Sequence, residues 1–226
     1  MRILIRPLPT TPSRIPGHAD PFTVGPSRLL VRTRVPRILD FDVEARPLHW
    51  ISGDYVSKEI TAMAWAWTDM PDVVTCYLLG ETEPDMMLRA FLVAYDAADM
   101  VTGHFIRGYD LPMVNGALTE YGLPALGDKL SHDTKLDLVR RQGLSGSQEN
   151  LGAMLRLEHR KVPMNQATWR TANRLTPEGL ALVQQRVVGD VQQHIEMRQR
   201  LLELGYLGPP KVWRSHSAEP VAVYTP

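Results

Sequence analysis

The sequence of 226 residues contains a single cysteine and carries no net charge. Cys76 lies in an apolar run, so we expect a buried thiol, and the chain alone can form neither a disulfide framework nor a zinc cluster. Because the charges balance, any nucleic-acid interface must rest on a local basic patch. No apolar run would span a membrane, and the N-terminal one is too short for a signal peptide. These absences favour a cytoplasmic protein without a membrane partner.

Proline is concentrated near the two ends of the chain, whereas the centre has an ordinary globular composition. Six prolines lie within residues 1–33, which predicts an extended arm. A flexible tail is predicted at 206–226. We therefore expect one folded domain at 34–205, and a hydrophobic content of 44% is sufficient for its core.

The order of the predicted elements indicates an α/β domain. We predict strands at 37–47, 60–67, 73–79 and 100–104, with a fifth strand or an irregular link at 130–134. We predict helices at 86–98, 110–121, 134–141, 151–157 and 177–204, with a polar, basic link between the last two. The short turns between the first three strands suggest an antiparallel meander. The expected sheet is mixed, with three antiparallel strands followed by parallel strands, and helices flank it.

The first predicted strand carries a row of acids. Asp40, Asp42 and Glu44 are two residues apart, so their side chains share one face of the strand, and the apolar residues between them share the other. Buried and unpaired, these carboxylates would repel one another and take up protons. A divalent cation would remove both problems, because Mg²⁺ and Mn²⁺ prefer oxygen ligands. The alternative is an edge strand whose acidic face is solvated.

Two further acids are candidates for the same site. Asp110 follows a short strand and opens a helix, where its carboxylate could bind a metal or cap the helix. Asp190 lies in the last helix among valines, beside Gly189, which allows a close approach. The spacing of four residues between Arg186, Asp190 and His194 also fits an ordinary ion pair on a helix face.

In the order Asp42, Glu44, Asp110 and Asp190, these acids resemble the site of the DEDD 3′–5′ exonucleases, which have a ribonuclease H-like fold. In that family an Asp-x-Glu pair lies on the first strand, a second Asp begins a helix after a Gly-His strand, and a final Asp lies in a late helix. The resemblance covers residues 35 to 203. It looks like a divergent, phage-type branch, which would place the protein in the host cytoplasm.

The resemblance implies hydrolysis of phosphodiester bonds at 3′ ends of single-stranded DNA or RNA. It also implies two Mg²⁺ or Mn²⁺ ions about 4 Å apart, with Asp42 between them and Glu44, Asp110 and Asp190 completing the ligand sets. Because the chain holds no polymerase domain, a proofreading role would require a replication or repair protein as partner.

The chain departs from the family in the residues near the last Asp. The family usually has a Tyr four residues before that Asp or a His five residues before it, and these positions hold Arg186 and Gln185 here. The family usually has Asn at the position of Phe105. His194 is one substitute for the missing general base, and His104 is a weaker one.

A basic segment between residues 129 and 186 fits a single-stranded nucleic acid, because its cations and Trp169 suit phosphate contacts and base stacking. A solvated helix surface is the alternative. The candidate substrate-binding residues are His104, Arg107, Arg160, Lys161, Arg170, Arg174 and Arg186.

Two other functions fit the same fold. The first is a nuclease that cuts internally, or on branched or hybrid duplexes. The second is a nucleic-acid-binding protein that has lost catalysis, for which Arg186 and Gln185 are the motivation.

Overall fold

The computed structural model describes residues 34–48, 57–140 and 142–215. The predicted arm at 1–33, most of the predicted turn between the first two strands, and the last part of the predicted tail lie outside these residues. Among the described helices, none is both long and apolar enough to cross a membrane.

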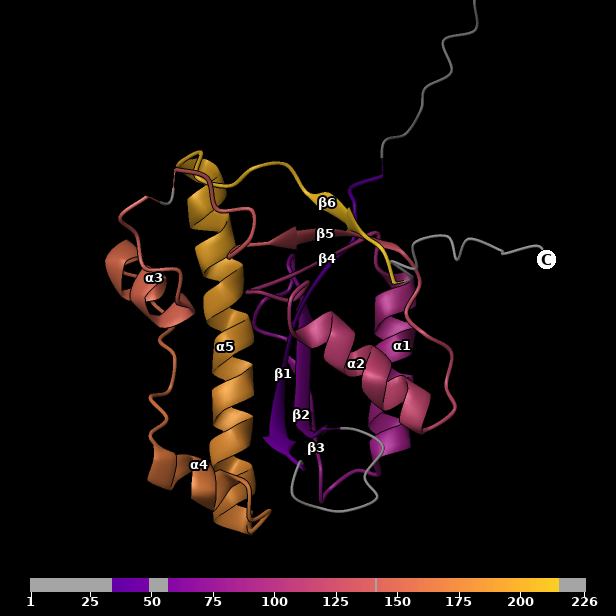
Figure 1. The fold of residues 1–226 in the computed structure, drawn as a ribbon. Helices are drawn as coiled ribbons and strands as arrows, with labels where there is room; N and C mark the ends of the chain where they lie inside the picture. The colour runs from indigo at the N-terminus through magenta and orange to yellow at the C-terminus, as the bar shows by residue number, and fades with distance from the viewer. Residues whose placement is uncertain (1–33, 49–56, 141, 216–226) are drawn as a thin grey trace, which may run out of the picture. The chain divides into compact units, whose positions relative to one another are not determined.

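The described residues form one six-stranded mixed sheet, in the order β3-β2-β1-β4-β5-β6 (Figure 1). Its strands are β1 (Ile38–Pro47), β2 (Lys58–Trp67), β3 (Thr75–Leu78), β4 (Met100–Gly103), β5 (Lys129–Asp133) and β6 (Lys211–Trp213). Strands β1, β2 and β3 pair antiparallel, whereas β1 with β4 and β4 with β5 pair parallel. The predicted meander, parallel strands and fifth strand are confirmed.

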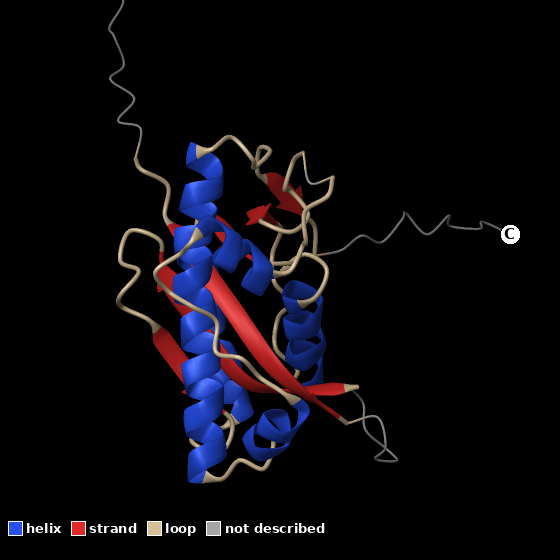
Figure 2. Ribbon diagram, turned by 90° about the vertical axis from the view of Figure 1, so that its left-hand side faces the viewer, coloured by secondary structure: helices blue, strands red, loops and turns tan. Residues whose placement is uncertain are grey.

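Helices cover both faces of the sheet, as Figures 1 and 2 show. They are α1 (Pro84–Ala97), α2 (Asp110–Glu120), α3 (Gln148–Leu155), α4 (Gln166–Ala172) and α5 (Pro177–Glu203). Helices α1 and α2 pack on one face, and the long helix α5 packs on the other with α4 beside it. The α/β class predicted from the sequence is therefore confirmed.

The two faces of β1 pack against different helices, and one face is apolar and the other acidic, as the alternation of its residues predicts. Leu39, Phe41 and Val43 are buried in the core beneath α1 and α2. The acidic residues between them face α5, which packs against β1 and β2. The small side chains of Ala62 and Ala64 on β2 lie in the core under α5, where they leave room for the helix to approach the sheet.

The helix predicted at 134–141 is wrong, because residues 134–140 form a turn, two bends and an isolated β-bridge of Leu138 with Leu207. The carboxylate of Asp133 accepts hydrogen bonds from the backbone N–H groups of Lys135 and Leu136, each at 3.0 Å. Such a local bond offers the backbone an alternative to the helix ladder. Arg140 has φ 53°, in the left-handed region, which also ends any helical path.

Two elements lie where the sequence predicts none. Helix α4 lies in the predicted link, and Asn165 caps it by accepting a hydrogen bond from the N–H of Thr168. Strand β6 lies in the predicted flexible tail, where it pairs antiparallel with β5. Both elements have seven residues or fewer, and a segment so short carries little periodicity for sequence reasoning to detect.

Candidate functional site

Three carboxylates from distant parts of the sequence meet between the sheet and α5. One oxygen each of Asp42, Glu44 and Asp190 lies within 4.8 Å of the others. Oxygen ligands lie about 2.0–2.6 Å from Mg²⁺ or Ca²⁺, so ligands of one ion can be up to about 5 Å apart. The spacing therefore suits a shared divalent cation.

Asp110 lies next to this group, at the start of α2. Its carboxylate is buried, and Oδ1 accepts a hydrogen bond of 3.3 Å from the backbone N–H of Val43, the residue between the two acids of β1. The charge of Asp110 contributes to raising the pKa of Asp42. The structure thus brings all four predicted acids together, three within reach of one ion and the fourth adjacent. We call these four residues the acidic cluster.

Burial makes the charged forms of the acidic cluster costly. Desolvation is the largest cause that raises the pKa of Asp42 well above its usual value, and the charges of Asp190 and Asp110 add to it. Desolvation likewise raises the pKa values of Glu44, Asp110 and Asp190 to about 7 each. A bound cation would favour the ionised carboxylates and so lower these pKa values.

Two basic side chains already lie on the acidic cluster. Arg186 Nε is 2.9 Å from Asp190 Oδ2 and 3.3 Å from Glu44 Oε1. Lys161 Nζ is 2.8 Å from the same oxygen of Asp190. Both residues were predicted to bind substrate, and the structure places them directly against predicted metal ligands. The i, i+4 ion pair between Arg186 and Asp190 is also confirmed.

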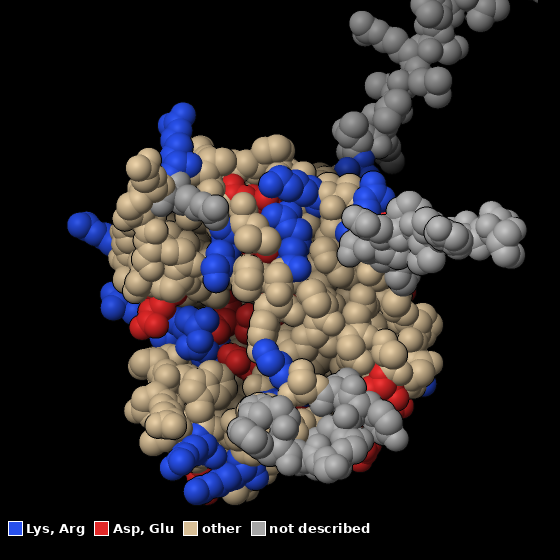
Figure 3. Space-filling view, viewed as in Figure 1, with Lys and Arg blue, Asp and Glu red and all other residues tan. Residues whose placement is uncertain are grey.

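The residues present fit a hard divalent cation. Within the part of the chain that the structure describes, Asp190 Oδ1 is buried and has no hydrogen-bond partner. Among the described residues, only Arg186 and Lys161 form ion pairs with these four carboxylates, so an excess of negative charge is left when all four are ionised. Figure 3 shows acidic side chains recessed between basic ones on the face in view. Oxygen donors and residual negative charge are the properties that Mg²⁺ or Mn²⁺ requires.

His194 is held in a different network. It is 2% exposed; its Nδ1 lies 2.5 Å from Asp40 Oδ2 and its Nε2 lies 2.9 Å from Thr134 Oγ1. With both ring nitrogens engaged, His194 joins α5 to β1 and to the turn after β5. This geometry favours a structural role over that of a general base, and it explains why Asp40 lies outside the acidic cluster.

His104 continues the same network towards the surface. Its Nδ1 is 3.0 Å from Thr134 Oγ1 and its Nε2 is 2.9 Å from the carbonyl oxygen of Gly146. Burial lowers the pKa of His104 to about 4, so the ring is neutral at pH 7. Sequence reasoning missed the chain of contacts from Asp40 to Gly146. The only signals were the position of His194 one turn after Asp190 and that of Asp40 two residues before Asp42.

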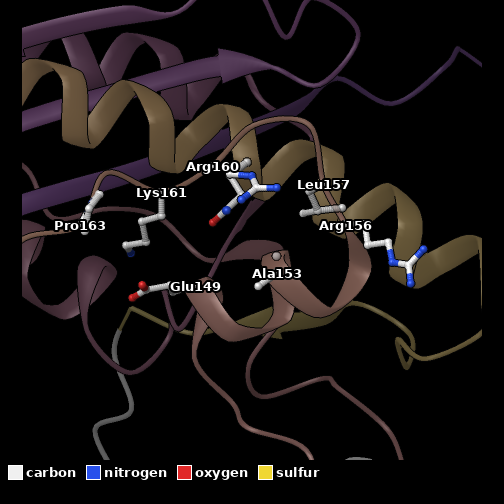
Figure 4. Close-up of a pocket in the computed structure, with 9 residues that line it drawn as sticks. Glu149, Ala153, Arg156, Leu157, Arg160, Lys161 and Pro163 are labelled. Atoms are coloured by element: carbon white, nitrogen blue, oxygen red, sulfur yellow. The ribbon is translucent and has the colours of Figure 1, made fainter.

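The remaining predicted substrate-binding residues are dispersed. Arg107 forms a largely buried ion pair with Asp137, at 2.6 Å. Arg170 lies on α4 and Arg174 just after it, and both are exposed. Arg160 lines a cavity of about 250 Å³ together with Lys161, among residues of α3, α5 and the segment between α3 and α4. Figure 4 shows Lys161 between Pro163 and Arg160 along the lining of this cavity.

Phe105 occupies a position that the family usually fills with Asn. Its φ is 72°, in the left-handed region where Asn is favoured over bulky residues. Its backbone N–H donates to Asp133 Oδ1 at 3.0 Å, and that of Arg107 donates to Asp133 Oδ2 at 3.0 Å. Asp133 therefore holds the loop that leads to Asp110.

Comparison with known proteins shows the fold. No family model matches the chain, and no curated protein matches it. Among solved structures, it is similar to the family B DNA polymerase from the hyperthermophilic archaeon Pyrobaculum calidifontis, with a TM-score of 0.57 and 15% sequence identity. The likeness covers 75% of this chain and 25% of the polymerase. The mixed sheet with its flanking helices is consistent with a ribonuclease H-like fold.

Proposed function

We propose that this protein is a divalent-metal-dependent nuclease that removes nucleotides from the 3′ ends of single-stranded DNA or RNA. The observation that carries the proposal is the meeting of Asp42, Glu44 and Asp190 within 4.8 Å. Asp42 and Glu44 are half-buried and Asp190 is buried, so the ionised cluster is costly without a bound cation, and carboxylates with such raised pKa values are typical of functional sites. The likeness to a DNA polymerase supports a nucleic-acid substrate.

In phosphodiester hydrolysis, different residues would bind the metal and orient the phosphate. Asp42, Glu44 and Asp190 would hold the cation, with Asp110 beside them. Bound there, a divalent cation supplies Lewis-acid polarisation of a phosphoryl oxygen and neutralises developing charge. Arg186 and Lys161 would orient the phosphate, because guanidinium and ammonium groups donate charge-assisted hydrogen bonds to its oxygens.

The residues around the acidic cluster also fit the substrate and the partner that we propose. Single-stranded nucleic acid is the substrate that the basic segment fits, with Arg160 lining a cavity that Lys161 joins to the acidic cluster. Because proofreading needs a polymerase, a replication or repair protein in the cytoplasm is the proposed partner.

The test is a cleavage assay on 5′-labelled single-stranded DNA and RNA with Mn²⁺ or EDTA. A ladder that shortens from the 3′ end, only with Mn²⁺, is the expected result, and discrete internal cuts would instead indicate an endonuclease. Asp42→Asn and Asp190→Asn should each lower the rate at least about 100-fold, the scale of losing one preorganised charge. Asp96→Asn, an exposed position on α1, is the matched control and should retain full activity.

One observation favours a second candidate, a binder without catalysis. Arg186 and Lys161 partly neutralise the acidic cluster, so the fold does not depend on a cation for all of its charge balance. Such a protein would bind labelled strands without cutting them, and Asp42→Asn would leave the affinity unchanged.

A further inference from the structure

Arg186 bridges two of the carboxylates that a bound cation would share. Its Nε–H group faces Asp190 Oδ2 at 2.9 Å and Glu44 Oε1 at 3.3 Å, which are two of the three carboxylates close enough to share an ion. A positive charge of the protein therefore already bridges β1 and α5 at the acidic cluster.

The guanidinium is fixed in this position. Its Nη1 donates a hydrogen bond of 2.5 Å to the carbonyl oxygen of Val162, in the segment between α3 and α4. The side chain is only 12% exposed and extends from the rigid helix α5. Three contacts on three different elements hold it, so a mobile ion would have to break all of them to displace it.

The net charge of the acidic cluster with its two basic partners also matches one divalent ion. Asp42, Glu44, Asp110 and Asp190 supply four negative charges when ionised, and Arg186 and Lys161 supply two positive ones. Counted over these six side chains, the two charges left over equal that of one Mg²⁺ or Mn²⁺, and Glu149 adds a further negative charge near Asp190. A second divalent ion would give a buried site an excess of positive charge, which is unfavourable unless Arg186 withdraws.

We propose that the acidic cluster binds one divalent cation and that Arg186 takes the place of the second ion of a two-ion site. This inference rests on the proposed function and specifies its site. The cation lies among Asp42, Glu44 and Asp190, where Asp190 Oδ1 has no other partner among the described residues. Arg186 supplies the remaining positive charge, in a planar geometry that suits phosphate oxygens.

The test counts bound Mn²⁺ by electron paramagnetic resonance, with equilibrium dialysis for stoichiometry. Wild type should bind one ion per chain and show the spectrum of an isolated Mn²⁺. Arg186→Gln removes the charge and should admit a second ion close enough to couple magnetically with the first. Arg186→Lys retains the charge and should keep the count at one, as should Arg200→Gln, which removes a surface ion pair on the same helix.

The outcomes separate this inference from the proposed function. Two ions in wild type, with cleavage intact, would overturn the inference and leave the proposed nuclease standing. One ion in both wild type and Arg186→Gln would also overturn it, because the arginine would not then be excluding a second ion. If Arg186→Gln does not fold, the wild-type count decides. Binding of no Mn²⁺, together with no cleavage, would overturn the proposed function itself.

Discussion

The metal-free protein should become less stable as the pH rises from 5 to 8. Glu44, Asp110 and Asp190 have pKa values of about 7 in the folded protein, above their ordinary values of 4.5, 3.8 and 3.8. Between these limits the folded state binds more protons than the unfolded state, so the free energy of unfolding falls with increasing pH. Above about pH 8 all three carboxylates are ionised in both states, and the decline should end.

The size of this fall in the free energy of unfolding can be worked out for Asp110 alone. Of the shift from 3.8 to about 7, about two units lie above pH 5, and at 1.36 kcal/mol per unit they correspond to about 3 kcal/mol lost across this pH range. For a protein of this size, 1 kcal/mol shifts the melting temperature by about 2–4 °C, so a fall of about 6–12 °C is expected. His104 opposes this trend between about pH 4 and 6.5, because burial lowers its pKa to about 4 and the unfolded state therefore binds the additional proton in that interval.

The assay is thermal unfolding followed by circular dichroism in EDTA at intervals from pH 5 to 8. Asp110→Asn keeps the shape of the side chain but removes its titration, so the difference between the two proteins isolates this carboxyl from His104. The variant should have the flatter profile and should be the more stable protein at pH 8. A wild-type melting temperature that rises steadily to pH 8, or equal profiles for both proteins, would refute the reasoning.

Three other perturbations test different parts of the account. Mn²⁺ should raise the melting temperature more at pH 7.5 than at pH 5.5, where protons compete for the carboxylates; an equal rise at both pH values would contradict binding at the acidic cluster. His194→Ala leaves the buried carboxylate of Asp40 without its partner and should cost about 3–5 kcal/mol in denaturant unfolding, whereas a loss below about 1 kcal/mol would show that the pair is unimportant. Gly152→Ala places a Cβ 2.5 Å from Gln193 Nε2, so this flexible amide must move and lose its hydrogen bond to the carbonyl oxygen of His159, which should cost at most about 1 kcal/mol by the same measurement; a loss above about 3 kcal/mol would show that Gln193 cannot move.

The fold could be predicted where the sequence pattern is long and regular. The alternation in residues 38–47 gives β1 and the assignment of its faces, and the 27 residues of α5 carry a clear helical period between a capping threonine and a glycine. Asp42 and Glu44 could be assigned to one site because a strand places them on one face. Asp110 could be added because it opens a helix after a strand, and Asp190 because it lies among valines in the last helix. The distances between the four carboxylates depend on how α5 crosses the sheet, and no local sequence pattern predicts that crossing.

The contacts that sequence reasoning missed are all between distant elements. Lys161 was assigned to substrate because a cation in a basic segment has no visible partner, yet it pairs with Asp190. His194 was considered as a base because helical spacing relates it to Asp190, whereas Asp40 lies 154 residues away in the sequence. Such pairings are decided by packing, and burial then makes them costly to break.

The most direct test of the central claim is the anomalous diffraction of a crystal soaked in Mn²⁺ at pH 7.5. We expect a peak within coordinating distance of oxygens from Asp42, Glu44 and Asp190, and its loss in Asp190→Asn. An acidic cluster that stays without a peak at millimolar Mn²⁺, with Arg186 still on its carboxylates, would contradict the account.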